Sequence, residues 1–366
     1  MKKNKILVLN YEFPPLGGGG GVATEKLVRG FIKLGFEVDV VTTHFKGLKL
    51  FESINNINIH RIKVIGRKEL PTASFASLVS FPFFAWKKVK ELCKANDYEF
   101  INTQFAVPTG PLGVFASKKF GFKNILSLHG GDIYDPTKKL SPHNSFFLRS
   151  IVRWVLNNSS YVVAQSSNTK DNALNIYKPN KSIGVIALPY EEFKFKKVTR
   201  AKLGLSKENK YVISCGRLVK RKGFDFFLKV ISKLPLNYKG IILGEGPERN
   251  NLEKLIKELK LEDRVKMPGF VSEEEKFQYL SNSDVYFLSS VHEGFGIVLQ
   301  EAMQVGLPIV STDNGGQTDF VLKENLIKHG NIQKATKKIL NVKKTMYDLK
   351  QYDLKTIANK YLEVMK

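Results

Sequence analysis

Two carboxylates in the C-terminal third of the chain have a spacing that suits ligand binding. Glu293 and Glu301 stand with seven residues between them in the stretch SSVHEGFGIVLQEAMQVGLPIVSTDNGG, residues 289–316. The apolar periodicity after Glu293 predicts a helix over Ile297–Val305, with Glu301 in its second turn. Carboxylates pair well with vicinal hydroxyls, so this pair predicts a site for a ligand that carries sugar rings. A buried helix with two capping or solvated glutamates is the alternative.

Backbone groups add to this candidate site. Phe295, Gly296 and Ile297 lie at the expected start of the helix, where N–H groups have no partner within the helix. Such a terminus attracts anions, and a glycine without Cβ lets a ligand come close. We therefore expect these three residues to contact the same ligand as the two glutamates.

Two cations follow the first strand of the second half of the chain. The strand is predicted over Lys210–Ser214, and the sequence continues as Cys-Gly216-Arg217-Leu-Val-Lys-Arg-Lys222-Gly. An arginine binds a phosphate through a forked contact, and a lysine binds it as a point charge. Arg217 and Lys222 at a strand end therefore predict a pyrophosphate site, although a basic surface loop is the alternative in so basic a chain.

The N-terminal half holds a glycine run and a strand-end histidine. The run Gly17–Gly21 lies between a predicted strand, Lys5–Asn10, and a predicted helix, Glu25–Leu34, a geometry in which backbone amides meet an anion or a sugar. His129 ends the strand Asn124–Leu128 and begins the motif His-Gly-Gly-Asp. Ligands of doubly wound sheets bind at this edge, so we expect a functional rather than a structural histidine.

The stretch EGFGIVLQEAMQVGLPIVSTDNGG resembles the E-x7-E signature of the GT4-type retaining glycosyltransferases (glycosyl transferases group 1). The resemblance covers nearly the full chain and is strongest at 211–223, 241–247 and 265–316. It implies transfer of a sugar from a nucleotide-sugar donor to an acceptor with retained anomeric configuration. The linker sequence Leu-Pro-Tyr-Glu-Glu, residues 188–192, departs from the Pro-Asn-Gly-Val-Asp of many relatives.

The resemblance also implies roles for the residues named above. Arg217 and Lys222 would stabilise the departing diphosphate, Glu301 would hold the ribose hydroxyls, and Glu293 would bind hydroxyls of the donor sugar. His129 would position the reacting sugar, while the glycine run would approach the phosphates or the acceptor. The expected catalytic residues are His129, Glu293, Arg217 and Lys222. The expected donor-binding residues are Gly17, Gly18, Gly19, Gly216, Arg217, Lys222, Gly246, Glu293, Phe295, Gly296, Ile297 and Glu301.

No metal or other cofactor is expected. The sequence has no Asp-x-Asp near a strand end, and its six histidines show no metal-ligand spacing. Two fixed cations can take the place of a divalent metal, so we predict a metal-independent enzyme. No nucleophile can be named, and front-face transfer assisted by the leaving phosphate is what the resemblance implies.

Length and patterning predict an α/β protein. The chain has 366 residues, enough for about two domains, and strands alternate with helices in both halves. With the resemblance, this predicts a GT-B fold of two Rossmann-like doubly wound domains that face each other across a cleft. The expected parts are an acceptor-binding domain over 1–190, a donor-binding domain over 201–350, and a helix over 351–366 that crosses back to the first domain.

Further strands are expected outside the site motifs. They lie at 37–42, 59–64, 100–103, 161–166, 241–246, 265–270, 284–289 and 308–311. Residues 189–200 are polar, charged and non-periodic, and we interpret them as the interdomain linker.

Cys93 and Cys215 each lie in an apolar element, which predicts reduced core thiols in a cytoplasmic protein. No leader peptide and no membrane span is expected from the sequence.

The charge is strongly positive. The formal net charge is +24, with an excess of +14 over residues 1–190 and +10 over residues 191–366. Such a field favours polyanions or an anionic membrane. Residues 70–94 combine Phe81, Phe83, Phe84 and Trp86 with four lysines, and Pro82 is expected to open a helix there. The stretch resembles an interfacial helix, so we expect a protein that can touch the inner face of the membrane; an ordinary packed helix is the alternative.

Three functions therefore remain open. The leading one is a retaining hexosyltransferase that uses a glycan or lipid-linked acceptor in cell-envelope polysaccharide or glycolipid synthesis. The second is a nucleotide-sugar epimerase or hydrolase on the same fold. The third is a non-enzymatic protein that binds polyanions or membranes, but no nucleic-acid-binding motif is present, so nucleic acid is not an expected partner. The nucleotide base, sugar, acceptor and oligomeric state are not encoded in any motif found.

Overall fold

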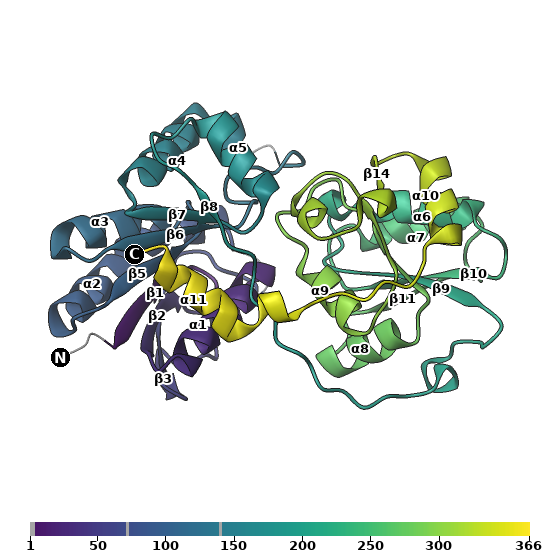
Figure 1. The fold of residues 1–366 in the computed structure, drawn as a ribbon, viewed down its shortest axis with the longest axis horizontal. Helices are drawn as coiled ribbons and strands as arrows, with labels where there is room; N and C mark the ends of the chain where they lie inside the picture. The colour runs from purple at the N-terminus through teal and green to yellow at the C-terminus, as the bar shows by residue number, and fades with distance from the viewer. Residues whose placement is uncertain (1–3, 71–72, 139–140) are drawn as a thin grey trace. The chain divides into compact units, whose positions relative to one another are not determined.

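The computed structural model describes residues 4–70, 73–138 and 141–366. The chain forms two compact units (Figure 1). The first unit consists of the chain up to Glu191 together with Lys350–Lys366, and the second consists of Glu192–Leu349. Residues 71 and 72, which belong to the predicted interfacial stretch 70–94, lie outside the described residues.

The first unit is a doubly wound sheet. Its described strands run in the order β3-β4-β2-β1-β5-β6-β7-β8, and all neighbours are parallel except β3 and β4. Because the chain leaves β1 first in one direction and then in the other, the topological switch point lies between β1 and β5. The strands are β1 Lys5–Leu9, β2 Glu37–Thr43, β3 Phe51–Ile54, β4 Ile57–Ile62, β5 Phe100–Gln104, β6 Asn124–Leu128, β7 Tyr161–Ala164 and β8 Gly184–Val185.

Helices cover both faces of this sheet. Ile6 and Val8 of β1 pack on the face of α1 and α11, whereas Leu7 and Leu9 pack on the face of α2 and α3. Burial on both faces explains why β1 is a continuous apolar run rather than an alternating one. The helices are α1 Gly19–Lys33, α2 Phe75–Ala95, α3 Gly110–Phe120, α4 Phe146–Asn158, α5 Ser167–Tyr177 and α11 Leu354–Glu363, with short 3-10 turns η1 Pro142–Asn144 and η6 Lys350–Tyr352.

Two predictions for the first unit were wrong in detail, and one strand was missed. Helix α1 begins at Gly19 rather than Glu25, so part of the glycine run is helical. Helix α2 begins at Phe75, capped by the Ser74 side chain, and Pro82 lies inside it instead of opening it. The antiparallel strand β3, which pairs with β4, was not predicted. The glycine run and Pro82 indicated the wrong helix starts, because these residues reflect local backbone preference. Tertiary packing overrides that preference here.

The second unit is also doubly wound, with all neighbouring strands parallel. Its described strands run in the order β11-β10-β9-β12-β13-β14, which places the switch point between β9 and β12. The strands are β9 Lys210–Cys215, β10 Tyr238–Leu243, β11 Val265–Gly269, β12 Val285–Leu288, β13 Ile309–Thr312 and β14 Leu326–Ile327. The helices are α6 Phe224–Lys233, α7 Arg249–Glu258, α8 Glu273–Ser281, α9 Ile297–Gln304 and α10 Ile332–Asn341, with short 3-10 turns at 200–203, 220–222, 316–319 and 323–325.

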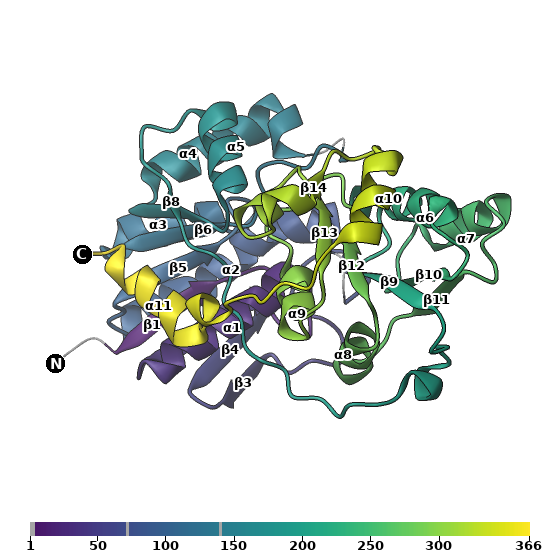
Figure 2. The ribbon, with the colours of Figure 1, turned by 45° about the vertical axis from the view of Figure 1, so that its right-hand side comes forward.

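Two helix layers sandwich this second sheet, as Figure 2 shows. One core cluster joins the sheet to α6, α7 and α10, and the other joins it to α8 and α9. The predicted linker is attached to the second layer, because Phe193 and Phe195 stack on Phe277 of α8 with ring centroids 5.0 and 5.4 Å apart.

Cys93 and Cys215 are buried free thiols, which confirms the prediction of core cysteines. Within the described residues, no helix is both long and apolar enough to cross a membrane.

The C-terminal helix α11 packs closely on α1 within the first unit (Figure 1). The contact depends on Gly30, because a Cβ there would lie 2.5 Å from the Leu354 carbonyl oxygen and 3.0 Å from the Ala358 Cβ. The rings of Tyr361 and Phe31 also pack in a T-shaped pair, with centroids 6.0 Å apart. A glycine inside a helix is therefore used here to bring two helices together.

We predict that Gly30→Ala destabilises the protein by about 2 kcal/mol, the cost of overpacking a tight contact. The sign of this change in stability is informative, because alanine at an open helix position stabilises the helix by roughly 1 kcal/mol relative to glycine. Urea unfolding measures the change in the free energy of unfolding. Gly18→Ala is the control, since a Cβ at Gly18 meets nothing within 4 Å. A Gly30→Ala protein as stable as wild type would contradict the close packing of α11.

Candidate active site

The predicted diphosphate and glutamate motifs meet at the switch point of the second sheet. The loop after β9 contains Gly216, Arg217 and Lys222, and the loop after β12 contains Glu293. Because β9 and β12 are parallel neighbours, their carboxyl ends open on the same edge. Doubly wound sheets bind ligands at this position.

Glu293 is the centre of a charged cluster. Its Oε1 accepts hydrogen bonds from Lys222 Nζ at 2.6 Å and from Ser290 Oγ at 2.6 Å, and its Oε2 accepts one from Arg221 Nη1 at 3.2 Å. The carboxylate is buried. Burial alone would raise its pKa, but Lys222, Arg221 and their hydrogen bonds outweigh that effect and lower the pKa to about 2. Glu293 is therefore ionised at neutral pH.

The loops around Glu293 approach one another at glycines. A Cβ at Gly315 would lie 2.3 Å from the Glu293 carbonyl oxygen, and a Cβ at Gly223 would lie 2.2 Å from the Ser289 carbonyl oxygen. Both glycines have positive φ, of 136° and 61°. Only glycine combines this backbone conformation with such close contact, so these positions fix where the Glu293 loop lies.

Arg217 is exposed in the loop after β9. That loop is tied to the loop after β10, since Leu218 N donates to the Glu245 carbonyl oxygen at 2.9 Å. A Cβ at Gly246 would lie 2.4 Å from the Leu218 carbonyl oxygen. Gly246 therefore serves the packing of these two loops. Its expected role in donor binding stays a prediction.

Helix α9 begins as expected. Gly296 is its N-cap in the left-handed region at φ 98°, and Ile297 is its first residue. Phe295 is buried and its ring packs against Phe320 with centroids 5.0 Å apart, so its side chain belongs to the core. Glu301 is buried in the second turn, as predicted.

A lysine that the sequence did not single out holds Glu301. Lys276 Nζ of α8 donates to Glu301 Oε1 at 2.8 Å and to Glu273 Oε1 at 2.8 Å. Burial lowers the pKa of Lys276, but its two carboxylate neighbours outweigh this and leave the pKa raised. Arg221, the other missed residue, lies beside Lys222 in a basic run. The run itself was visible in the sequence, but only the fold selects which of its members faces Glu293.

In the first unit, the glycine run already binds an internal carboxylate. Glu12 Oε2 accepts from Gly18 N at 3.3 Å and Glu12 Oε1 accepts from Gly21 N at 3.1 Å. Burial raises the pKa of Glu12, while the two amides act in the opposite direction. A Cβ at Gly17 would lie 2.4 Å from the Glu12 Cβ. Two amides of the glycine run thus have a partner within the chain, and the expected contact of the run with phosphates or acceptor stays a prediction.

His129 follows β6 and is held on several sides. Its Nε2 lies 2.6 Å from Gln104 Oε1, and its ring stacks on Phe105 with centroids 4.2 Å apart. Its backbone N–H donates to Asp132 Oδ1 at 2.9 Å. Burial lowers the pKa of His129 to about 4, although the Gln165 side chain acts against this. Burial raises the pKa of Asp132 to about 6.

Family models match both units of the chain. The Glycosyltransferase Family 4 model matches residues 17–189, and the Glycosyl transferases group 1 model matches residues 195–356. The chain belongs to the GT4-type glycosyltransferases. This confirms the resemblance seen in the E-x7-E stretch.

Curated relatives agree with this assignment. The chain is 26% identical over 324 residues to N-acetyl-alpha-D-glucosaminyl L-malate synthase of Bacillus anthracis, which covers 84% of this chain and 79% of the relative. It is 26% identical over 302 residues to a Campylobacter jejuni N-acetylgalactosaminyltransferase named for a diphospho-undecaprenol acceptor, which covers 82% and 79%.

Solved structures share the fold. Sucrose-phosphate synthase from Thermosynechococcus elongatus matches with a TM-score of 0.81 at 18% identity, over 99% of this chain and 98% of that one. Anabaena HepE in complex with UDP matches with a TM-score of 0.76 at 21% identity, over 99% of each chain. The predicted GT-B fold class of two doubly wound domains is thereby confirmed.

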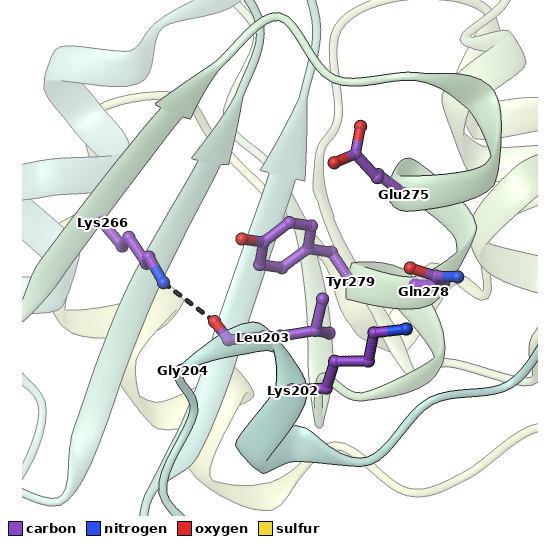
Figure 3. A pocket seen from close by; sticks show the side chains of 7 residues that line it. All are labelled: Lys202, Leu203, Gly204, Lys266, Glu275, Gln278 and Tyr279. Atoms are coloured by element: carbon purple, nitrogen blue, oxygen red, sulfur yellow. Dashed lines mark hydrogen bonds between the residues drawn. The ribbon is translucent and has the colours of Figure 1, made fainter.

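One open pocket of the glycosyltransferase lies away from these motifs. It has a volume of about 430 Å³ and is lined by Lys202, Leu203, Gly204, Lys266, Glu275, Gln278 and Tyr279 (Figure 3). One of its lysines, Lys266, already donates to the Leu203 carbonyl oxygen at 2.8 Å. None of the predicted site residues lines this pocket, so it does not coincide with the Glu293 cluster. Among the residues that the structure describes, no group of three His, Cys, Asp or Glu side chains gathers as a metal site would require.

The Glu293 cluster predicts a pH dependence of stability. The folded-state pKa of Glu293 lies below the ordinary value of 4.5 at about 2, so its ionised form stabilises the fold above pH 4.5. That stability is lost as pH falls towards 2. We expect Glu293→Gln to destabilise the protein by about 3 kcal/mol at neutral pH, because it leaves the half-buried Lys222 without its carboxylate.

Urea unfolding between pH 7 and pH 3 measures this effect. The difference between wild type and Glu293→Gln should shrink as the solution becomes more acidic. Glu253→Gln serves as the control, because its ion pair with Arg249 lies on the exposed face of α7 and should change stability little. A difference that is independent of pH would contradict the ionised, doubly paired state of Glu293.

Proposed function

We propose that this glycosyltransferase moves a sugar from a nucleotide-diphosphate sugar to a glycan or lipid-linked acceptor, with retention of configuration and without a metal ion. The observation that carries the proposal is the cluster at the second switch point, where Lys222 and Arg221 meet Glu293 and Arg217 follows β9. The UDP complex of Anabaena HepE, which has the same fold, supports a nucleotide donor. The diphospho-undecaprenol acceptor named for the Campylobacter relative supports a lipid-linked one.

The cations suit the departing group. Negative charge on the diphosphate grows as the bond to the sugar breaks, and cations fixed beforehand stabilise that charge without reorganisation. Arg217 and Lys222 would bind the two phosphates, with Arg221 adding a third positive charge. Lys222 is fixed by Glu293 at 2.6 Å, so its position is set before a donor arrives. Three cations in one loop can supply the charge that a divalent metal supplies elsewhere, which is why we propose metal independence.

The carboxylates would bind hydroxyl groups of the donor. Glu293 would contact the transferred sugar, with the amides of Phe295, Gly296 and Ile297 at the start of α9. Glu301, one turn further into α9, would contact the ribose while Lys276 holds its Oε1. Glu293 is held by two cations, which makes it a poor nucleophile. The proposal is therefore front-face transfer, in which the leaving phosphate assists the incoming acceptor, and not the paired-carboxylate route of retaining glycosidases.

The first unit would contribute His129 and would bind the acceptor. His129 would position the reacting sugar at the carboxyl edge of β6. The glycines Gly17, Gly18 and Gly19 would approach the phosphates or the acceptor, while Glu12 holds the amides of Gly18 and Gly21 in the same run.

We predict that one series of nucleotide-diphosphate sugars (UDP, GDP or ADP) raises the melting temperature of wild type and is hydrolysed or transferred. Arg217→Ala and Lys222→Ala should each weaken donor binding at least tenfold, because each removes a charge-assisted hydrogen bond to phosphate. Thermal shift and donor turnover measure this. Lys229→Ala is the control, since Lys229 pairs with Asp225 on the surface of α6. Activity should persist in EDTA.

Three outcomes would redirect the proposal. Loss of activity in EDTA would contradict metal independence. Release of free sugar at the full rate, with no transfer to glycan or polyprenyl-phosphate acceptors, would favour a hydrolase. If no nucleotide stabilises wild type, the polyanion-binding alternative takes precedence.

The outer face of α2, α3 and α4 supports contact with an anionic membrane. These three helices carry eight lysines and arginines and one carboxylate, Glu91. Large apolar side chains are exposed among them, with Phe83 at 75% and Phe146 at 88%. The exposed set differs from the one expected from the sequence, because Phe81 is buried and Trp86 packs against Phe120. The apolar residues of this surface are Phe75, Val79, Phe83, Phe84, Phe115, Phe146 and Phe147.

Aromatic side chains beside cations are the composition of an interfacial surface. We therefore propose that the enzyme works at the cytoplasmic face of a membrane, where a lipid-linked acceptor of cell-envelope polysaccharide or glycolipid synthesis would reside.

We predict that the protein sediments with phosphatidylglycerol vesicles at low salt and is released at high salt, because its cations attract anionic headgroups. The double variant Phe83→Ser/Phe84→Ser should bind at least tenfold more weakly, since it removes two apolar side chains from the interface. Phe270→Ser is the matched control, because Phe270 is 84% exposed in the second unit. Equal binding of both variants, or no binding of wild type, would contradict the membrane-contact proposal.

A further inference from the structure

A buried polar network runs along one face of the first sheet and ends at His129. Asn102 and Gln104 of β5 and Ser127 of β6 point to the face that α1 and α11 cover, in register with one another. All three side chains are buried. Tyr361 of α11 completes the network, with its Oη 3.0 Å from Ser127 Oγ. The C-terminal helix thus contacts the same network as the strand-end histidine.

The direction of each hydrogen bond follows from one fixed acceptor. Asn102 Nδ2 lies 3.3 Å from the carbonyl oxygen of Ile125, and a carbonyl oxygen can only accept. The amide nitrogen of Asn102 must therefore face Ile125, which turns its Oδ1 towards Gln104. An acceptor there requires a donor, so the Nε2 of Gln104 faces Asn102. The amide oxygen of Gln104 is then left to face His129.

The ring nitrogen of His129 that faces this oxygen must be a hydrogen-bond donor. Gln104 Oε1 lies 2.6 Å from His129 Nε2, so the proton of the neutral ring sits on Nε2. Burial disfavours the imidazolium, which keeps the ring neutral near pH 7. Nδ1 consequently keeps its lone pair and is the hydrogen-bond acceptor of the ring.

The far end of the network has a defined direction as well. Ser127 Oγ accepts from Asn102 Nδ2 and from Gln104 Nε2, each at 3.3 Å, which uses both of its lone pairs. Its own hydrogen is then donated to Tyr361 Oη. Both hydrogens of the Gln104 amide are engaged in the same way, by Asn102 and Ser127. The Gln104 amide therefore cannot rotate without breaking two hydrogen bonds.

We propose that Gln104 is a positioning residue that locks His129 in the Nε2–H tautomer, with Tyr361 of the C-terminal helix supporting it through Ser127. His129 then offers Nδ1 as an acceptor for a substrate hydroxyl, and the ring stacked on Phe105 keeps one orientation. The tautomer assignment rests on the geometry of the first unit alone. Its value for sugar transfer rests on the proposed function.

The first test is the tautomer of His129 in the full-length wild-type protein. Nitrogen-15 NMR of the histidine rings at pH 7 distinguishes a protonated from an unprotonated ring nitrogen, and His129→Asn assigns the signal among the six histidines. We expect a neutral ring with the proton on Nε2. A ring with the proton on Nδ1, or a mixture of both forms, would overturn the proposal without any variant and without any activity assay.

The second test removes the lock. Gln104→Met keeps the length of the side chain but has no acceptor oxygen, so the His129 signal should become a mixture of tautomers. The turnover number should fall about tenfold, the worth of roughly one hydrogen bond, with a smaller change in KM for the donor. Tyr361→Phe should shift the His129 signal in the same direction by less. A pure Nε2–H signal in Gln104→Met would show that another group sets the tautomer and would overturn the proposal.

The control is Tyr98→Phe, another buried hydroxyl of the first unit. Tyr98 donates to Asp39 Oδ2 at 2.5 Å and belongs to the core cluster on the opposite face of the sheet, so its loss should leave the His129 signal unchanged. The readouts also separate the two proposals. One possible result is that wild type shows the Nε2–H signal, that Gln104→Met abolishes it, and that the protein has no transferase activity. The positioning role of Gln104 would then stand, and the proposed function would be refuted.

Discussion

A buried, ionised carboxylate needs cations beside it, and this requirement determines how the loops of the second unit are arranged. Glu293 lies beneath the protein surface with Lys222 and Arg221 on its two oxygens. An ionised group in a medium of low dielectric is tolerated only when partners compensate for the lost hydration. The loops that carry these partners come from β9 and β12, which are neighbours only because the sheet reverses its winding direction between them. Sheet topology thus creates the charged cluster.

The same constraint explains the glycines of the second unit. Two loops can share one carboxylate only when their backbones approach closely, and side chains would prevent that approach. A Cβ at Gly223 or at Gly315 would lie within 2.3 Å of a carbonyl oxygen of the neighbouring loop. Their role is to bring charges together, and they need no ligand contact to account for their presence. The first unit repeats this solution, because Glu12 binds the amides of Gly18 and Gly21 where a phosphate was expected.

The buried polar groups at the two candidate sites differ. At the site of the second unit, the ionised carboxylate of Glu293 is held by Lys222 and Arg221. In the first, the network behind His129 consists of neutral amides and hydroxyls whose hydrogen bonds each have a definite direction. A neutral hydrogen-bonded network holds a side chain rigidly without the desolvation penalty of a charge. Such rigidity suits a histidine whose function depends on which nitrogen carries the proton. The basic outer face of α2, α3 and α4 depends only on which side chains are present and exposed there. It requires no comparable arrangement of core residues.

Much of this protein is determined by local sequence patterns. Continuous apolar runs predicted the parallel strands, because burial on both faces requires them. The E-x7-E spacing placed Glu301 in the second turn of α9, and the Gly-Arg-x4-Lys-Gly run placed Arg217 and Lys222 after a strand. These predictions depend on periods and spacings of a few residues, which a chain retains whatever its tertiary structure.

The tertiary structure alone decided which side chains meet. Lys276 reaches Glu301 from another helix, Glu12 occupies the glycine amides, and Gln104 faces His129 from a neighbouring strand. It also decided that Phe81 is buried while Phe83 is exposed, and that a glycine inside α1 admits α11. Each of these contacts joins residues separated in sequence by at least six positions or depends on the rotation of a helix against its sheet. Their energies come from packing and burial, which no local pattern encodes.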